Sequence, residues 1–568
     1  MSTAKKSGII SDIAAIGAAG NGIKSFAKIG FDEKNDDGGE VFENMIISGG
    51  EAHCLASPSV ICGNISAGDG VSFRRYDGTV FFACGTAVYK INRDGSAACI
   101  GNNAISSGAG AFYEFDGGLY LTDGEKIVEV RENSCVSHDI YVPMMYKNCS
   151  SDGSSYTSNE AKNLFSPYVE LKYNSISVNG LYTPRGQTVT EFISLRNNLG
   201  LDMTGNYRAT YLSDGRLYLS GNKDSRTVTI RVALADESQQ EHQDAKTAFL
   251  SSHDMFDVTL GGESKKMFFY NGKVYILALT DYGYVTEEGT SADIPSGITK
   301  VIPYDGGWYL FSPDKIYRMY FGEEEEIVIT PVACDFGCDV PESISCDETK
   351  IIFMNSARGL YCFGKYGADG EEGIFRISYN IKEFLDGFAT AQLKNAKGIC
   401  TKSNYYLFVG DMIFIWKWDK EDKLCLAEFD DEKKLEWKHL SGVSVDSVAG
   451  YNINTVFIVS DGSLKRFEYS KYSDDSLLGT YSSGRLFPKS FEKRVLCQLN
   501  ISAKITGTAT LSVFYDGKAT PDVYSVSGDG EEKIYRIRLP AREFYSFALV
   551  LSGYKTTLYG YEMNYYSA

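Results

Sequence analysis

The sequence predicts an all-β protein: a seven-bladed β-propeller with an inserted β-sandwich domain and a C-terminal β-sandwich domain. Three observations predict this fold. A strand–turn–strand phrase recurs seven times, the chain is rich in aromatic residues and Gly (39 Tyr, 32 Phe and 57 Gly), and apolar and polar residues alternate in several runs outside the repeats. Aromatic residues favour pleated sheets and Gly favours turns, whereas helical periodicity is scarce. Together these features indicate strands.

The repeated phrase is the first element to justify. Its copies read YDGTVFFACGTAVYKI from Tyr76, FDGGLYLTDGEKIVEV from Phe115, YNGKVYILALTDYGYV from Tyr270, YDGGWYLFSPDKIYRM from Tyr304, CDETKIIFMNSARGLYCF from Cys346, SNYYLFVGDMIFIWKW from Ser403 and YNINTVFIVSDGSLKRF from Tyr451. Four copies have Asp-Gly or Asn-Gly at the first turn, the dipeptides that most readily adopt positive φ in a hairpin. A single hairpin cannot bury its apolar face, but hairpins stacked around a common axis can, so the repeat predicts a propeller.

The spacing of the copies sets the domain boundaries. Successive copies begin 34 to 57 residues apart, except for one gap of 155 residues between the second and third, and a four-stranded blade needs ~40–50 residues. We therefore place blades 1 and 2 in residues 43–140 and blades 3 to 7 in residues 251–475. The aromatic side chains of Phe81, Tyr120 and Trp308 fall inside these hairpins, and we expect them in the packed core.

The remaining segments have other patterns. Residues 1–42 contain an acidic patch and are predicted to be an N-terminal arm. The insertion, residues 141–250, contains runs such as VELKYNSISV and RTVTIRVAL that are typical of a small β-sandwich. Residues 476–568 contain five strand-like runs, enough for a second sandwich. Short helices are expected over Asp12–Ala27, Asn159–Leu164 and Glu237–Leu250.

Charge and cysteine content limit the function classes. The net charge is −18, which argues against a protein that binds and reads nucleic acid but not against one through which DNA slides. Thirteen Cys without a regular framework indicate reduced thiols and synthesis in a cytoplasm. We expect neither a secretory signal nor a membrane-spanning segment.

Candidate chemical sites are few. The five histidines (His53, His138, His242, His253 and His439) are not paired at metal-ligand spacing. Cys334, Cys338 and Cys346 have no second cysteine pair or nearby His to complete a zinc site, so we interpret them as small apolar side chains. The acidic runs Glu323–Glu326 and Asp430–Glu432 are contiguous, unlike a calcium loop, and are interpreted as solvated turns.

Motifs for catalysis are also missing from the sequence. Walker A, dinucleotide-binding, Gly-x-Ser-x-Gly and sialidase-type boxes do not occur. We therefore predict no enzyme activity, no catalytic, cofactor-binding or metal-binding residues, and no cofactor. A carbohydrate-binding or glycan-degrading propeller stays open as an alternative, because two converging carboxylates suffice for glycoside cleavage. A cellular interaction scaffold is a further alternative.

Short motifs in four places resemble one known family. These are Glu43-Asn44-Met45 followed by Ser48-Gly49-Gly50, the first two blade phrases, the link from Tyr141-Val142-Pro143 to Asn163-Leu164-Phe165-Ser166-Pro167, and a C-terminal set with Phe487-Pro488, SVFYDGKA and RIRLP. They resemble the tail-tube nozzle, or stabilisation, proteins of short-tailed bacteriophages. In the link, Met144 stands where the family usually has Thr, and Phe165-Ser166 replace Leu-Thr.

The resemblance implies a structural role in a virion. Several copies, six in that family, would form a homo-oligomeric ring around a DNA channel in the phage tail. The ring would retain the packaged genome and let it pass at ejection, without sequence-specific binding. It would contact other tail or head–tail adaptor proteins, and it would assemble in the host cytoplasm.

Overall fold

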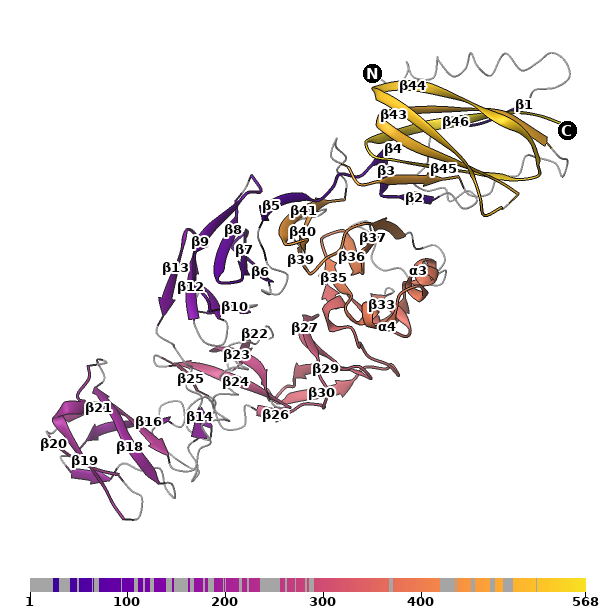
Figure 1. Cartoon of the computed structure of the whole chain (residues 1–568). Helices are drawn as coiled ribbons and strands as arrows, with labels where there is room; N and C mark the ends of the chain where they lie inside the picture. The colour runs from indigo at the N-terminus through magenta and orange to yellow at the C-terminus, as the bar shows by residue number, and fades with distance from the viewer. Residues whose placement is uncertain are drawn as a thin grey trace, which may run out of the picture.

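The computed structural model describes most of residues 24–567 (Figure 1). The larger gaps are 30–40, 66–70, 107–110, 123–126, 139–145, 148–161, 164–167, 182–187, 235–255, 286–290, 367–370, 419–434, 451–454, 470–475 and 484–493, and some shorter ones lie between the strands. The described residues are predominantly β-strand, which confirms the predicted all-β class.

Seven antiparallel sheets, numbered here 1 to 7, account for most of these strands. Sheet 1 contains β6 (Val71–Tyr76), β7 (Thr79–Cys84), β8 (Ala87–Ile91) and β9 (Ala97–Gly101); sheet 2 contains β10 (Ala111–Phe115), β11 (Gly118–Thr122), β12 (Ile127–Arg131) and β13 (Ser134–His138). Sheet 3 contains β22 (Phe256–Leu260), β23 (Glu263–Tyr270), β24 (Lys273–Thr280), β25 (Gly283–Val285) and β26 (Ser291–Asp293). Sheet 4 contains β27 (Lys300–Tyr304), β28 (Gly307–Phe311), β29 (Ile316–Phe321) and β30 (Ile327–Pro331).

The last three sheets follow in the same manner. Sheet 5 contains β31 (Ser345–Cys346), β32 (Lys350–Asn355), β33 (Gly359–Tyr366) and β34 (Glu371–Arg376); sheet 6 contains β35 (Lys397–Cys400), β36 (Asn404–Val409), β37 (Met412–Lys417) and β38 (Trp437–Ser441). Sheet 7 contains β39 (Ser447–Gly450), β40 (Thr455–Ser460), β41 (Ser463–Glu468) and the early strand β5 (Ser59–Gly63). Each of the seven repeated phrases supplies consecutive strands of a different sheet.

The Asp-Gly turns explain the local hairpin geometry. Asp77 and Gly78 have φ values of 45° and 75°, and Asp305 and Gly306 have φ values of 47° and 71°. Two successive residues with positive φ make the turn that matches the twist of antiparallel strands. The prediction made from these dipeptides is therefore confirmed at both turns.

Neighbouring sheets share apolar cores. Sheets 1 and 2 pack through Phe81, Leu119 and their neighbours, and sheets 3 and 4 pack through Met267 and Leu310. One cluster joins sheets 4, 5 and 6, another joins sheets 6 and 7, and a further one joins sheet 7 back to sheet 1. The first strands of successive sheets also lie together, β27 beside β31, β31 beside β35, β35 beside β39, β39 beside β6, and β6 beside β10.

Sheet 7 is completed by a strand from near the start of the described chain. β5 pairs antiparallel with β41, with Cys62 opposite Leu464 and Ser59 opposite Arg466. The Ser59 hydroxyl also donates a hydrogen bond to the Arg466 carbonyl, 3.3 Å away. Because β6 follows β5 in the chain, this pairing holds the beginning of the seven-sheet series against its end (Figure 1).

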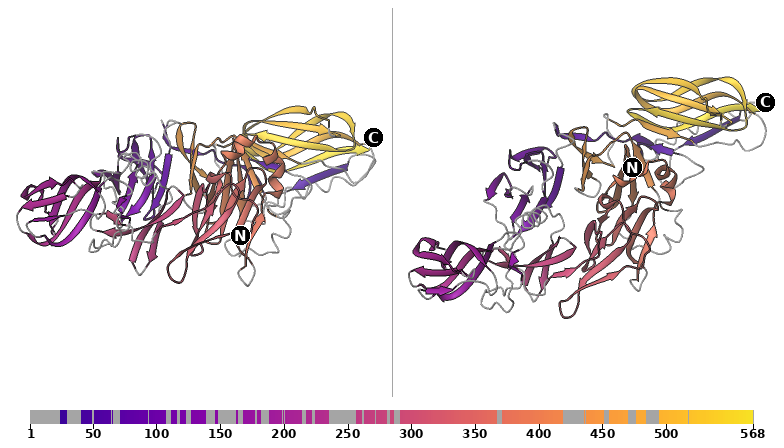
Figure 2. Two further views of the ribbon diagram at one scale, coloured as in Figure 1. Left: turned by 90° about the horizontal axis from the view of Figure 1, so that it is seen from below. Right: turned by 60° about the horizontal axis from the view of Figure 1, so that its bottom comes forward.

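The insertion forms separate sheets between sheets 2 and 3, at one end of the elongated molecule (Figure 2). Two three-stranded sheets are made by β16 (Tyr168–Ile176), β21 (Asp224–Leu234) and β18 (Val189–Asn197), and by β17 (Asn179–Leu181), β20 (Leu217–Gly221) and β19 (Tyr207–Tyr211). A small pair, β14 (Tyr146–Lys147) and β15 (Lys162–Asn163), lies before them, and a 3-10 turn, η1 (Thr204–Asn206), precedes β19. Both three-stranded sheets bury apolar side chains, among them Ile230 in the first and Leu217 in the second.

A nine-stranded sheet, called here the C-terminal sheet, forms the opposite end of the molecule. It contains β42 (Gly479–Ser482), β43 (Arg494–Tyr515), β44 (Asp522–Phe544), β45 (Phe547–Gly553) and β46 (Thr556–Ser567), together with β1 (Lys24–Ile29), β2 (Val41–Glu43), β3 (Met45–Ser48) and β4 (Glu51–Cys54). The 22-residue β43 pairs with β44 on one edge, and with β46 and then β45 on the other. Two register shifts in β43 bend it around a single apolar cluster.

The N-terminal strands differ from the prediction. Residues 1–42 were expected to be an arm and residue 43 to begin the first blade, but β1 to β4 all belong to the C-terminal sheet. Met45, Ala52 and Cys54 are buried in its apolar cluster, and the Cys54 thiol donates to the Gly553 carbonyl at 3.3 Å. A strand pattern shows which face is buried but not which distant strand it joins, so the sequence could not reveal this assignment.

Helices are short and mostly not where they were expected. The chain from Lys24 onward is the strand β1 instead of the end of a helix over Asp12–Ala27, and Lys162–Asn163 is β15. Residues 237–250 lie outside the described part of the chain. The described helical segments are η2 (Pro341–Ser343), η3 (Tyr379–Ile381), α3 (Lys382–Asp386) and α4 (Thr390–Lys394), besides η1.

Candidate functional site

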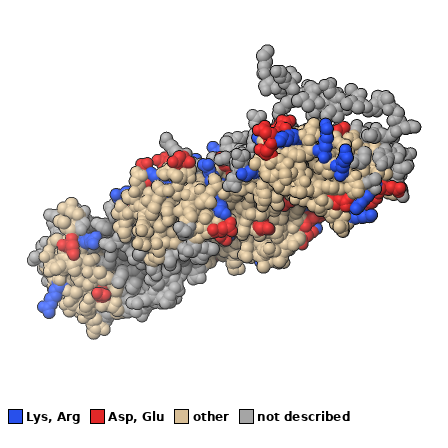
Figure 3. Space-filling view, turned by 45° about the horizontal axis from the view of Figure 1, so that its top comes forward, with Lys and Arg blue, Asp and Glu red and all other residues tan. Residues whose placement is uncertain are grey.

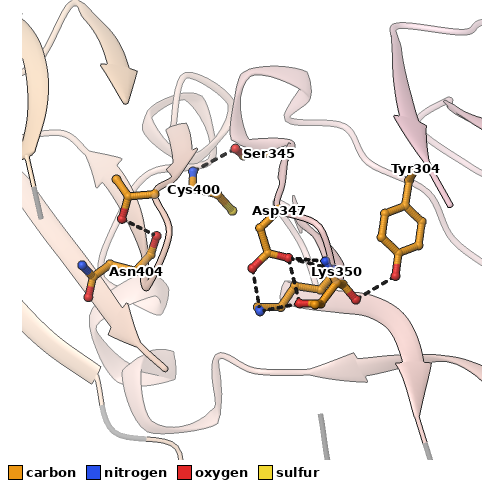
Figure 4. A network of polar contacts seen from close by, with 8 residues as sticks. Tyr304, Ser345, Asp347, Lys350, Cys400 and Asn404 are labelled. Carbon is orange, nitrogen blue, oxygen red and sulfur yellow. Dashed lines mark hydrogen bonds and ion pairs between the residues drawn. The ribbon is translucent and has the colours of Figure 1, made fainter. Parts of the chain in front are cut away.

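A buried polar cluster lies where sheets 4, 5 and 6 meet. We call it the Lys350 cluster and define it as Tyr304, Asp347, Thr349, Lys350 and Trp418. Tyr304 ends β27 in sheet 4. Asp347 and Thr349 lie in the turn between β31 and β32 of sheet 5, Lys350 begins β32, and Trp418 follows β37 in sheet 6. Figure 4 shows the acidic and basic side chains pointing at one another, with Tyr304 on one side and Cys400 and Asn404 of sheet 6 on the other.

The Lys350 ammonium group is buried and fully surrounded. The residue is 2% exposed. Its Nζ atom lies 2.8 Å from Asp347 Oδ2 and 3.0 Å from Thr349 Oγ1, and 4.0 Å from the centre of the Trp418 ring. Two oxygens and one aromatic face therefore meet the three N–H bonds of the ammonium group, which leaves no free donor for a substrate.

Asp347 also organises the backbone of its turn. Its Oδ1 accepts hydrogen bonds from the backbone N–H groups of Thr349 at 2.7 Å and Lys350 at 2.9 Å, and from the Thr349 hydroxyl at 2.9 Å. This is the local side-chain-to-backbone bonding by which Asp favours turns. The Tyr304 hydroxyl donates to the Thr349 carbonyl at 2.7 Å, so sheet 4 is tied to the same turn.

Three thiols lie near this charge pair, on the strands of sheets 5 and 6. Burial raises the pKa of Cys362 to about 12, although the Lys350 charge opposes this. Burial likewise raises the pKa of Cys346, and it raises that of Cys400 well above its ordinary value. Because the thiolate is the nucleophile and the metal ligand, these neutral thiols are suited to packing and not to attack on a substrate.

Three of the four tryptophans gather on sheet 6. Trp416 is 4% exposed and lies 5.2 Å from Trp418 and 6.2 Å from Trp437, measured between ring centres. The Trp437 indole N–H donates to the Ile377 carbonyl at 2.7 Å. Trp418 covers Lys350, so these rings are engaged in packing and do not form an open platform for a sugar ring.

The three cysteines considered for a zinc site, Cys334, Cys338 and Cys346, are free thiols that lie in or against one apolar cluster. The Cys334 thiol donates to the Phe336 carbonyl at 3.1 Å, and the buried Cys338 thiol donates to the Met354 carbonyl at 3.0 Å. Burial raises the pKa of Cys338 to about 11, so it is a protonated donor. Among the residues that the structure describes, no three His, Cys, Asp or Glu side chains are grouped so as to hold a metal ion.

The described histidines are also separated. His53 belongs to the C-terminal sheet, where its Nδ1 lies 3.1 Å from the Thr557 hydroxyl. His439 lies in sheet 6 and packs against the Phe384 ring at 4.5 Å, and burial lowers its pKa. His138 ends β13 in sheet 2, while His242 and His253 fall outside the described residues.

The acidic run Glu323–Glu326 forms an exposed turn between β29 and β30. Glu325 has a positive φ of 60°, and the Glu326 carboxylate accepts the Glu324 backbone N–H at 3.0 Å. The structure therefore places all four carboxylates at the surface of sheet 4. The other run, Asp430–Glu432, is outside the described part of the chain.

Sequence reasoning missed the Lys350 cluster because its members come from three sheets. The sequence Asp347-Glu348-Thr349-Lys350 is a turn that places a lysine at the start of an apolar strand. Trp418, the aromatic residue that covers this lysine, lies in the next repeat.

None of the described helices is long and apolar enough to cross a membrane. In comparisons with known proteins, no protein-family model and no curated protein sequence matches the chain.

Proposed function

We propose that this protein is a structural component of a bacteriophage tail, of which several copies form a ring around a DNA channel. In this proposal the seven sheets close into a seven-bladed β-propeller. The insertion and the C-terminal sheet are two sandwich-like additions that place each copy in the assembly. The ring retains the packaged genome and lets it pass at ejection, and it has no enzymatic activity.

The observation that carries the proposal is the pairing of β5 with β41. A propeller built from one chain closes when its first and last blades share strands, because an unshared end would leave an open sheet edge. Here an early strand completes sheet 7, and one apolar cluster joins sheet 7 to sheet 1. Six of the seven neighbouring pairs needed for a closed circle share such a cluster.

The polar chemistry supports a passive role. The buried charge in the Lys350 cluster is saturated by Asp347, Thr349 and Trp418, and burial raises the pKa of the nearby thiols. Such groups stabilise contacts between sheets. The net charge of −18 is compatible with a wall along which DNA slides, since like charge prevents tight binding of the phosphate backbone.

The function can be tested with the purified full-length protein. Mass photometry and negative-stain electron microscopy should show ring-shaped homo-oligomers, six-fold if the family resemblance holds. Antibodies against the protein should label the tails of particles produced in a host that carries the gene. A protein that stays monomeric at every concentration tested and is missing from particles would contradict the proposal. Hydrolysis of host polysaccharide would instead favour a glycan-degrading tail protein.

A further inference from the structure

Charge is unevenly divided along the chain. Residues 494–568, most of the C-terminal sheet, contain eight Lys or Arg and seven Asp or Glu, whereas the preceding residues contain the other 48 basic and 67 acidic ones. The C-terminal end of the molecule therefore has a net charge of about +1 and the rest about −19 by this count. Figure 3 shows basic and acidic side chains side by side on the end formed by the C-terminal sheet.

The 23-residue strand β44 is an open edge of that sheet. Among the described residues it pairs only with β43, from Asp522 opposite Val513 to Phe544 opposite Arg494. Its second row of backbone N–H and C=O groups has no strand beside it in the described part of the chain. A long unpaired edge is a surface on which another chain can add, unless charged residues block it.

The C-terminal half of β44 presents a mixed apolar and basic stripe. Ile534 is 40% exposed, and Arg536 and Arg538 follow on the same face, both exposed, while Tyr535 and Ile537 between them pack against the apolar cluster. Two other basic residues of the strand have acidic partners, Lys533 with Asp529 at 2.5 Å and Arg542 with Asp522 at 3.0 Å, and the exposed Glu531 and Glu532 precede the stripe. Neither Arg536 nor Arg538 has an ion-pair partner among the described residues.

We propose that Ile534, Arg536 and Arg538 on the open edge of β44 bind the acidic surface of a second copy of this chain. This inference rests on the proposed ring, and it identifies one of the two surfaces that the ring requires. Two arginines offer forked donors that match carboxylates. The complementary surface is the Glu323–Glu326 turn of sheet 4, in which all four carboxylates are exposed.

The contact is head-to-tail. The basic stripe and the acidic turn lie on different sheets of one chain, so each copy uses one surface to bind the previous copy and the other to bind the next. Such heterologous contacts build closed rings or open filaments, whereas a surface that binds itself builds two-fold dimers. A ring around a channel therefore needs two different surfaces on each copy, and the basic stripe and the acidic turn would supply them.

The test is charge reversal in the full-length protein. R536E/R538E should weaken self-association at least 100-fold in sedimentation velocity, and the melting temperature of the monomer should stay unchanged because both side chains are exposed. R208E/K402E makes the same change in net charge at exposed positions in the insertion and sheet 6, and it should leave the ring intact. E323R/E324R added to R536E/R538E should restore the ring.

The outcomes separate this inference from the proposed function. Rings that persist in R536E/R538E would contradict the β44 contact and leave the ring itself standing. Loss of rings in R208E/K402E as well would show a general effect of net charge and would also contradict it. A wild-type protein without rings would contradict both proposals. In a further outcome, the wild-type protein and R208E/K402E both bind duplex DNA in a salt-dependent way, while R536E/R538E keeps its rings but loses this binding. That result would contradict the contact between copies and assign the stripe to DNA.

Discussion

Replacement of Asp347 by Ala should lower the free energy of unfolding of the sheet 4–6 region by about 3–5 kcal/mol. This is the usual cost of removing one partner of a buried ion pair, because the other charge stays buried without compensation. The Asp347 carboxylate accepts four hydrogen bonds, one of them from the Lys350 Nζ atom at 2.8 Å. Without it, an ammonium group whose side chain is 3% exposed keeps only the Thr349 hydroxyl and the Trp418 ring.

The assay is urea unfolding followed by tryptophan fluorescence. Three of the four tryptophans lie on sheet 6, within the same packed region, so the signal reports on the sheets that the cluster joins. Lys350→Met removes the charge but keeps an apolar chain of similar length, and it should cost less than Asp347→Ala. The double variant D347A/K350M should regain part of the loss, because no unpaired charge remains buried.

Two results would refute this reasoning. If Asp347→Ala changed the free energy of unfolding by less than about 1 kcal/mol, the pair would behave like an exposed surface ion pair. If D347A/K350M were no more stable than D347A, the damage would come from the lost turn hydrogen bonds and not from the stranded charge. Asp347→Asn, which can keep the backbone bonds, would then separate the two contributions.

Three further predictions follow from burial. Tyr309→Ala should cost about 3–5 kcal/mol, because Tyr309 is 0% exposed, whereas half-buried Trp308→Ala should cost less; equal melting temperatures for the two variants would contradict this order. Burial lowers the pKa of His439 below its ordinary value, so the unfolded chain binds the proton more readily, and stability should fall as the pH drops below about 6.5; His439→Gln should flatten that part of a pH–stability profile, and an unchanged slope would contradict it. Iodoacetamide should modify exposed Cys99 in the native protein but reach Cys338 and Cys362 only after denaturation; peptide mass spectrometry showing early labelling of the buried pair would disprove their assigned positions.

The hairpins could be predicted from the sequence because their signals are local. Asp305-Gly306 specifies its turn within two residues, and the apolar run after it specifies the strand. The partner of a strand is not local in this sense. β5 joins β41, and β4 joins β46 near the end of the chain, and no pattern within either segment encodes that pairing. The Lys350 cluster was missed for the same reason, since Tyr304 and Thr349 meet across 45 residues.

Asn44 shows how the N-terminal segment holds the two large parts of the molecule together. It lies between β2 and β3, has a positive φ of 55°, and is 3% exposed. Its side-chain Oδ1 accepts the Ser441 backbone N–H from sheet 6 at 2.8 Å, and its Nδ2 donates to the Leu478 carbonyl at 3.0 Å. Asn is among the few residues that tolerate this backbone conformation while offering both a donor and an acceptor.

The chain also crosses between these parts twice, once from β4 to β5 and once from β41 to β42. Two covalent crossings and the buried Asn44 side chain restrict how the C-terminal sheet can turn relative to sheets 6 and 7. A rigid junction is what a head-to-tail ring requires, because the angle between the basic stripe on β44 and the acidic turn on sheet 4 decides whether successive copies close into a circle or continue as a filament. The Glu43-Asn44-Met45 motif that resembles the phage family thus lies at the position where the geometry of the proposed assembly would be set.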